Sequence, residues 1–293
     1  MGEGKNWHDK YYKLMLIIPA LLLLFSLYSI YSFYNETGDI FEKDISLTGG
    51  TAVTINGEVQ IAELKDFLFS KNIDDISTRE ISDLRTGTEL AVIIETKLSP
   101  EEIQPILEEF LGYGLTSENS SIEFTGDALS QGFYQQLRIA LIIAFVMMSL
   151  VIFVIFRTFI PSAAVIISAI TDITMTLAVL DLFEVRISNA GIVALLMLIG
   201  YSVDSDILLT TRALKSKTGS INSRLFQAFK TGMTMTLTSI AAVAAALLII
   251  YSFSPVLTQI FSIVLIGLGF DLLNTWITNV GILKWYIERR KIN

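Results

Sequence analysis

Six long apolar segments separated by polar stretches dominate this chain of 293 residues. Each is long enough to cross the hydrocarbon core of a bilayer as an α-helix. They lie at residues 14–34, 137–156, 161–180, 187–209, 231–253 and 256–285. The first follows a polar, basic tail (residues 1–13), which is also typical of a signal peptide. It is longer than a usual signal-peptide core and no small-x-small cleavage site follows it, so we predict an uncleaved anchor.

Residues 35–136 interrupt the apolar pattern with shorter segments of strand and helix periodicity. Strand-like segments lie at 44–55, 76–84, 89–96 and 121–125, the middle two joined by a turn around Gly87. Helical periodicity covers residues 59–71, and Ser99 with Glu102 three positions later forms a capping box before a second helix. The order βαββαβ is that of a ferredoxin-like α+β domain.

Lysine and arginine mark one set of segment ends, which predicts the orientation in the membrane. The basic residues at these ends are Lys5, Lys10, Lys13, Arg157, Arg212, Lys215, Lys217, Arg224, Lys230, Lys284, Arg289, Arg290 and Lys291. The short connections at the other ends hold only Arg186. We therefore predict that both termini and the loop 210–230 are cytoplasmic. Residues 35–136 would form a domain outside, and residues 137–293 a five-helix membrane domain in the cell membrane.

Composition supports this division and excludes several classes of protein. Hydrophobic residues make up 52% of the chain, and the net charge is −8. Residues 35–137 hold 20 acidic and 6 basic side chains, so the basic excess lies in the membrane part. There is no cysteine, and the single histidine, His8, lies in the tail, which excludes metal centres based on these ligands. No nucleotide-binding loop, nucleophile–base pair or basic nucleic-acid face appears, so we expect no enzyme, cofactor, metal or nucleic acid.

Four aspartates lie inside the apolar segments: Asp172, Asp204, Asp206 and Asp271. An ionised Asp at the centre of a spanning helix costs roughly 2.5–3.5 kcal/mol, so such a residue usually marks an ion or proton path. Residues two apart point about 200° away from each other, and at most one of Asp204 and Asp206 can face a central seam.

Depth estimates favour Asp204 over Asp206. At 1.5 Å per residue from the basic ends, Asp204 lies about 12 Å deep, Asp172 about 16 Å and Asp271 about 20 Å. Asp206 lies only about 9 Å deep, near the headgroups. The alternative is that each Asp bonds locally, for example to Ser202 or Asn274, and only fixes helix packing.

Around Asp204 the segment Gly200-Tyr201-Ser202-Val203-Asp204-Ser205-Asp206-Ile207 resembles the SecF family of the Sec protein-export machinery, in its archaeal branch. Leu47-Thr48-Gly49-Gly50-Thr51 is similar to an early Gly-Gly motif of that family. The resemblance covers the whole chain. It implies a permease of the resistance-nodulation-division type and a SecD-like partner. It also implies work beside a SecY-type channel, where proton-motive force helps secreted polypeptides across the membrane.

The chain departs from the bacterial pattern of this family at its acids. Asp204-Ser205-Asp206 stands where Asn-Asp-Thr is commoner, Thr171-Asp172 replaces a His-Asp pair, and Asp271 replaces a Gly. A proton relay carried over from the family therefore rests best on Asp204 and Asp172, with Asp206 and Asp271 as further candidates. Gly200, Tyr201, Ser202 and Thr171 would support them.

Two other classes of protein compete with an accessory subunit of the translocase. Half of a related exporter of lipids or small molecules would usually carry a second large outer domain. Here the corresponding loop, residues 181–186, is too short for one. A passive membrane scaffold would need no titrating acids.

Overall fold

The structure is a computed structural model that describes residues 12, 14–82, 86, 88–215, 220–251 and 253–290. Some of the predictions fall on other residues. These are the basic residues Lys5, Lys10, Lys13, Lys217 and Lys291, together with His8 and the turn at Gly87.

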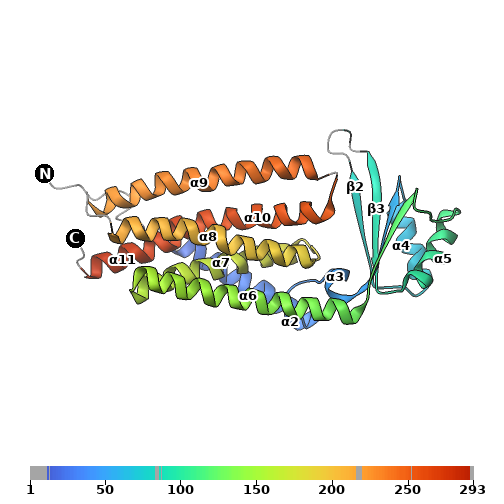
Figure 1. The fold of residues 1–293 in the computed structure, drawn as a ribbon, viewed down its shortest axis with the longest axis horizontal. Coiled ribbons are helices and arrows are strands. Elements are labelled where there is room, and N and C mark those ends of the chain that lie inside the picture. Colours follow the sequence, from blue (N-terminus) through green and yellow to red (C-terminus); the bar gives the residue numbers. More distant parts are fainter. Residues whose placement is uncertain are drawn as a thin grey trace.

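Within the residues that the structure describes, six helical spans form a bundle with a small sheet domain at one end (Figure 1). The first five spans are α2 (Ile17–Thr37), α6 (Asp127–Phe156), α7 (Phe159–Leu182), α8 (Asn189–Lys215) and α9 (Ile221–Ile250). The sixth is continuous from Pro255 to Arg290 and consists of α10 (Pro255–Leu273), the π-helix η1 (Asn274–Asn279) and α11 (Val280–Arg290). All six are long and apolar enough to cross a membrane, which confirms the predicted polytopic fold.

Helices α7 and α8 lie at the centre of the bundle. Two thirds of the most apolar window of α7 is buried, against about a tenth for α2 and α6 and less for α9. The apolar core of the bundle joins these central helices to α10, through residues such as Val165, Leu198 and Val264. The outer helices therefore present most of their apolar side chains to their surroundings.

The sheet domain confirms the predicted βαββαβ order. It consists of β1 (Gly50–Asn56), α4 (Ile61–Ser70), β2 (Ile76–Ser82), β3 (Glu89–Thr96), α5 (Pro100–Leu111) and β4 (Ser120–Thr125). The sheet order is β2-β3-β1-β4, and all neighbours are antiparallel. Helices α4 and α5 cover the face away from the bundle (Figure 1), and the Ser99–Glu102 capping box is present.

Two boundaries differ from the sequence prediction. Residues 45–48, predicted as part of the first strand, form a helical turn instead, α3 (Ile45–Thr48). Asp44 caps this turn by accepting a hydrogen bond from Ser46 N at 2.8 Å, and Leu47 packs into the bundle core. Helix α6 begins at Asp127, well before residue 137, because its first turns are polar and extend beyond the apolar segment toward the sheet.

The Gly-Gly motif lies where the chain passes from α3 into β1. Gly49 and Gly50 have φ of 88° and 134°, which other residues rarely adopt. A Cβ on Gly49 would lie 2.7 Å from Asp127 Cα, and one on Gly50 would overlap the Thr96 carbonyl oxygen. Glycine is required here because the chain passes, without room for a side chain, between the start of α6 and the end of β3.

Candidate functional site

Three of the four membrane aspartates meet inside the bundle. Asp172 comes from α7, Asp206 from α8 and Asp271 from α10, and all three are fully buried. We call these three residues the acid cluster. The fourth, Asp204, lies on the exposed surface of α8.

Asp172 is held by two strong hydrogen bonds. Ser202 Oγ on α8 donates to its Oδ2 at 2.5 Å, and Asn274 Nδ2 on η1 donates to its Oδ1 at 2.6 Å. Thr171, its predicted companion, instead donates to the carbonyl of Ile167 within its own helix. Asp172 therefore ties α7 to both neighbouring elements.

Asp206 and Asp271 share a single hydroxyl. Thr275 Oγ1 lies 2.9 Å from Asp206 Oδ1 and 3.0 Å from Asp271 Oδ1. Asn279 Nδ2 also donates to Asp206 at 2.7 Å, and Ser205 Oγ lies 3.1 Å from Asp271. Because the Thr275 hydroxyl has one proton, it can donate to only one of the two carboxyls at a time.

One oxygen of the cluster has no conventional partner. Asp206 Oδ2 accepts no hydrogen bond from the described residues, although the Ser168 hydroxyl lies near this carboxyl. Among the ion pairs of the described chain, none involves Asp172, Asp206 or Asp271. The cluster is thus stabilised by neutral hydroxyl and amide donors.

The π-helix supplies three of these donors: Asn274, Thr275 and Asn279. In an α-helix, residues five apart point about 140° from each other, whereas i→i+5 bonding brings them closer to the same side. Widening the helix at η1 therefore lets it contact Asp172 and Asp206 together. Sequence reasoning named Asn274 but missed Ser205, Thr275 and Asn279, and no periodicity in the sequence marks the π turn.

The structure reverses the expected order of Asp204 and Asp206. The two point to opposite faces of α8, as helical geometry requires, but Asp206 faces the seam and Asp204 faces outward. Ser202, Ser205 and Leu209 share the buried face of Asp206, whereas Gly200 and Tyr201 share the exposed face of Asp204. Depth along the helix, on which the prediction rested, does not determine which face turns inward.

Gly200 makes no close helix contact within the described chain, because a Cβ there would meet nothing within 4 Å. Close approaches occur instead at Gly267, against Leu198, and at Gly232, against the ring of Trp276. Among the described residues no group of three or more carboxylates or histidines is arranged to hold a metal ion.

Comparison with known proteins gives consistent matches. The family described as "Protein export membrane protein SecD/SecF, C-terminal" matches residues 107–289. The SecF protein of Methanocaldococcus jannaschii is 39% identical, over 95% of this chain and 96% of its own length. Those of Methanothermobacter thermautotrophicus and Pyrococcus furiosus are 37% and 32% identical, covering 96% and 95% of this chain and 94% and 92% of their own lengths.

Solved structures share the fold. The crystal structure of SecDF, a translocon-associated membrane protein from Thermus thermophilus, matches with a TM-score of 0.73 at 18% identity. A SecDF structure in a super-membrane-facing form matches with a TM-score of 0.60 at 17% identity. Each match covers 94% of this chain but only 38% of the SecDF chain, so the present chain spans well under half of those proteins.

The fold and the sequence matches define a multi-pass membrane protein with a SecDF-like architecture. The chain belongs to the SecF family of protein-export membrane proteins, as the resemblance at Gly200-Tyr201-Ser202 predicted. Members of this family are accessory membrane proteins of the export machinery and not enzymes.

Proposed function

We propose that this SecF-family chain works with a SecD-like partner to couple proton-motive force to protein export. The observation that supports this most is the acid cluster, in which three buried carboxyls meet and form no ion pair with any described residue. Three ionised carboxylates in a low-dielectric interior would repel one another strongly. The arrangement therefore favours one or more protons within the cluster, and export would depend on their entry and release.

The bridging hydroxyl of Thr275 gives this proposal a chemical path. A protonated Asp271 can donate to Thr275 Oγ1 while the Thr275 hydroxyl donates to Asp206. If Asp271 passes its proton to Thr275 Oγ1 and Thr275 passes its own proton to Asp206, the net result is one proton transferred from Asp271 to Asp206. Asp172 joins the same unit through Ser202 and Asn274. Changing the charge of the cluster would then change how α7, α8 and η1 pack.

An exposed carboxylate in a membrane span supports the need for a partner. Asp204 faces away from the bundle, and the exposed face of neighbouring α9 carries Thr234 and Thr238. Charged groups in spans rarely face lipid, because a lipid-facing charge is costly. A SecD-like subunit packed here would remove Asp204 from lipid and complete the transport unit. Secreted polypeptides and a SecY-type channel would be its further partners.

We propose the orientation that the charge pattern predicts. Tyr12 Oη donates to Glu288 Oε2 at 3.0 Å, so both ends of the described chain lie at the same end of the bundle, opposite the sheet domain (Figure 1). Placing those ends in the cytoplasm puts the sheet domain outside, where it can act on emerging chains. A lipid or small-molecule exporter is the alternative, and the short connection between α7 and α8 disfavours it.

A pair of matched substitutions tests the proton coupling. Asp206→Asn keeps size and hydrogen bonding but cannot titrate, and we expect it to abolish the proton-dependent part of export while assembly stays normal. Asp204→Asn makes the same chemical change on the exposed face and should retain most proton-dependent export. Export by Asp206→Asn vesicles at the wild-type rate across a range of proton-motive force would contradict the relay.

The partner is tested separately by purification from native membranes. A second polytopic subunit of SecD type should co-purify in a fixed ratio. A fully active preparation that lacks any such subunit would contradict the proposed partnership.

A further inference from the structure

The segment that leads into the outer domain is part of the bundle. Ile187 N donates to Glu42 O at 2.7 Å, and Asp44 N donates to Ile187 O at 3.1 Å. Asn189 Nδ2 donates to Ser46 O at 3.0 Å, and Leu47 lies in the bundle core. We call residues 41–48 the strap. The strap is thus fixed to the outer ends of the membrane helices, whereas the sheet begins only at Gly50.

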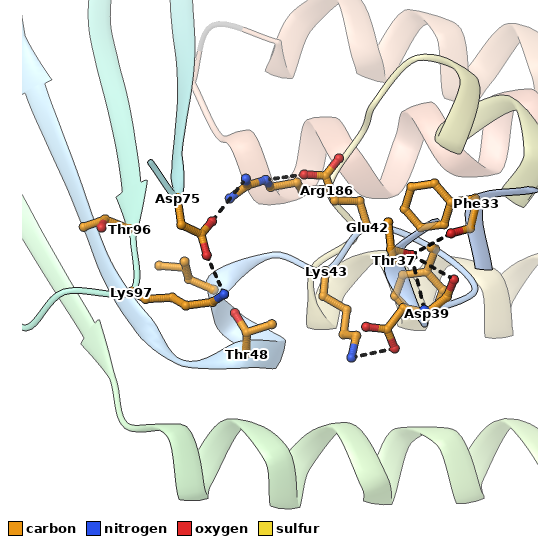
Figure 2. Close-up of a pocket in the computed structure, with 12 residues that line it drawn as sticks. Phe33, Thr37, Asp39, Glu42, Lys43, Thr48, Asp75, Thr96, Lys97 and Arg186 are labelled. Carbon is orange, nitrogen blue, oxygen red and sulfur yellow. Dashed lines mark hydrogen bonds and ion pairs between the residues drawn. The ribbon is translucent and has the colours of Figure 1, made fainter. Parts of the chain in front are cut away.

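The sheet domain has its own apolar core, separate from that of the bundle. Two cavities, of about 180 and 390 Å³, lie between them. The smaller is lined by strap residues together with Asp75, Lys97 and Arg186 (Figure 2). The larger lies between β2 and the outer ends of α7 and α10. Domains that share no large apolar interface are expected to move relative to each other.

Ion pairs connect the sheet to the bundle across this hollow junction. Arg186, in the α7–α8 loop, bonds Glu42 of the strap at 2.8 Å and reaches Asp75 of the outer domain at 3.8 Å. Figure 2 shows Asp75 between Arg186 and Lys97, with which it forms a second ion pair. These side chains are partly exposed, so their attachment is weak and open to solvent.

Beneath them, two carboxyls meet at the same junction. Glu95 of β3 is 6% exposed and lies beside Asp44 of the strap, because Asp44 Oδ2 is 3.9 Å from the same Arg79 Nη2 that contacts Glu95. Arg79 of β2 donates to Glu95 Oε1 at 3.3 Å, but Glu95 Oε2 has no donor among the described residues. Asp44 Oδ1 already accepts a hydrogen bond from Ser46 N at 2.8 Å. A proton on Glu95 would complete the network by donating to Asp44.

Electrostatics agree with this assignment. Burial, and next the charge of Asp44, raise the pKa of Glu95 from 4.5 to about 7, while Arg79 and Arg186 act in the opposite direction. Among the described residues, the charged groups that act on Glu95 are thus Asp44 of the strap, Arg79 of β2 and Arg186 of the α7–α8 loop.

We propose that the junction is a pH-sensitive switch, in which a proton shared by Glu95 and Asp44 holds the outer domain on the strap. Loss of this proton leaves two facing carboxylates, and their repulsion releases the sheet from the bundle. That the switch senses the medium outside the cell rests on the proposed orientation, but the switch itself does not depend on the acid cluster. It concerns a separate set of residues at the outer ends of the spans.

The direction of the pH effect follows from the raised pKa. Glu95 is protonated below about pH 7 when docked, and only below its ordinary value of 4.5 when released into solvent. Docking therefore takes up a proton between these values and weakens as pH rises from 4.5 to about 7, with no further change above. The docking constant would fall by roughly 300-fold at most over this window.

Distance measurements on the full-length protein in lipid nanodiscs test the switch. The chain has no native cysteine, so spin labels can be placed on Lys65→Cys of α4 and Phe253→Cys near the start of α10, both exposed. We expect a single short distance at pH 4.5 and a growing second, longer distance up to pH 7. Glu95→Gln, which imitates the protonated form, should keep the short distance at pH 8.

Glu123→Gln, an exposed carboxyl on β4, is the matched control and should titrate like the wild type. Carboxyl-selective NMR titration of Glu95 provides a second readout should a variant fold poorly. Identical distance distributions at pH 5 and pH 8 in the wild type would overturn the proposal, and so would a Glu95 carboxyl that titrates near 4.5. Because Asp206→Asn leaves the junction intact, it should show the wild-type distance change even where export is lost.

Discussion

The acid cluster and the outer junction both bury carboxyl groups close to one another. They differ in the groups that stabilise these carboxyls. In the acid cluster every hydrogen bond comes from a hydroxyl or an amide, whereas Glu95, Asp44 and Asp75 at the junction contact Arg79, Arg186 or Lys97. A neutral donor keeps its hydrogen bond whether the carboxyl is charged or not, while an arginine favours only the charged form.

The difference matters for what each site can do. A carboxyl surrounded by neutral donors can gain or lose a proton without breaking its contacts, which suits a group that exchanges protons repeatedly. A carboxyl between an arginine and another carboxyl changes its strongest interactions when it titrates, which suits a switch of conformation. The two sites also depend differently on solvent, since salt screens the partly exposed junction but not the buried cluster.

The largest loss of stability is expected in the acid cluster, when a carboxyl that accepts buried hydrogen bonds is removed. Asp172→Leu leaves Ser202 Oγ and Asn274 Nδ2 buried without it, and should lower the free energy of unfolding by about 3 kcal/mol. Asp204→Leu, the same change on the exposed face, should change it by less than about 0.5 kcal/mol. Unfolding in mixed micelles with increasing denaturing detergent measures both. Equal losses would mean that the cluster hydrogen bonds add little to stability.

A smaller loss is expected at the crossing that positions the strap. Gly49→Ala combines a positive φ with a clash against Asp127 and should destabilise the chain by about 2 kcal/mol. Gly57→Ala shares the positive φ (107°) but has open space around it, so its cost should be about 1 kcal/mol. The same unfolding measurement distinguishes strain from clash, and similar values for the two variants would show that the crossing can relax.

At the junction itself, removing a cation should move the pH response without abolishing it. Arg79→Gln takes away a charge that lowers the pKa of Glu95, so that pKa should rise further above about 7. The release of the outer domain should then extend to higher pH, by less than about one unit because Arg79 is partly exposed. The spin-label distances against pH measure the shift. A shift to lower pH, or no shift, would show that Arg79 does not stabilise the ionised form of the Glu95–Asp44 pair.

The smallest effect is expected for an ion pair on the far side of the outer domain. Lys71 contacts Glu109 at 2.9 Å between α4 and α5, but both side chains are well exposed. Lys71→Gln should therefore change the free energy of unfolding by less than about 0.5 kcal/mol and leave the pH response of the junction unaltered. A loss above about 1 kcal/mol would show that exposed ion pairs contribute substantially to the stability of this domain.

Most of the fold could be predicted because it rests on long, uniform patterns. A run of about twenty uncharged, mostly apolar residues can hardly form anything but a spanning helix, and the short apolar run at residues 90–94, with its β-branched residues, favours a buried strand. The cap at Ser99 needs only four residues of local sequence, and it is present as predicted. The start of α6 was less accessible, because a polar helix that continues past the membrane has no apolar boundary.

The sites were harder because they depend on which face of an element turns inward. Asp204 and Asp206 are chemically equal and two residues apart, and only packing against α7 and η1 selects Asp206 for the interior. Likewise, Glu95 ends a strand whose pattern looks ordinary, and its burial comes from a strap about fifty residues earlier in the chain. The burial of Asp206 and that of Glu95 therefore cannot be predicted from local periodicity.

A π turn can be regarded as an α-helix that has accepted one extra residue. Deleting a single position within η1, such as Ile277, would restore regular winding with little rotation of α11, because five α-helical residues turn the chain about as far as six π-helical ones. The buried side chains of Leu283 and Ile287 would then keep their places at the end of the bundle far from the sheet domain. The deletion would instead bring Asn274 and Asn279 one residue closer together and disturb their contacts with Asp172 and Asp206, so the extra residue of the sixth span serves the aspartates and not the helix end.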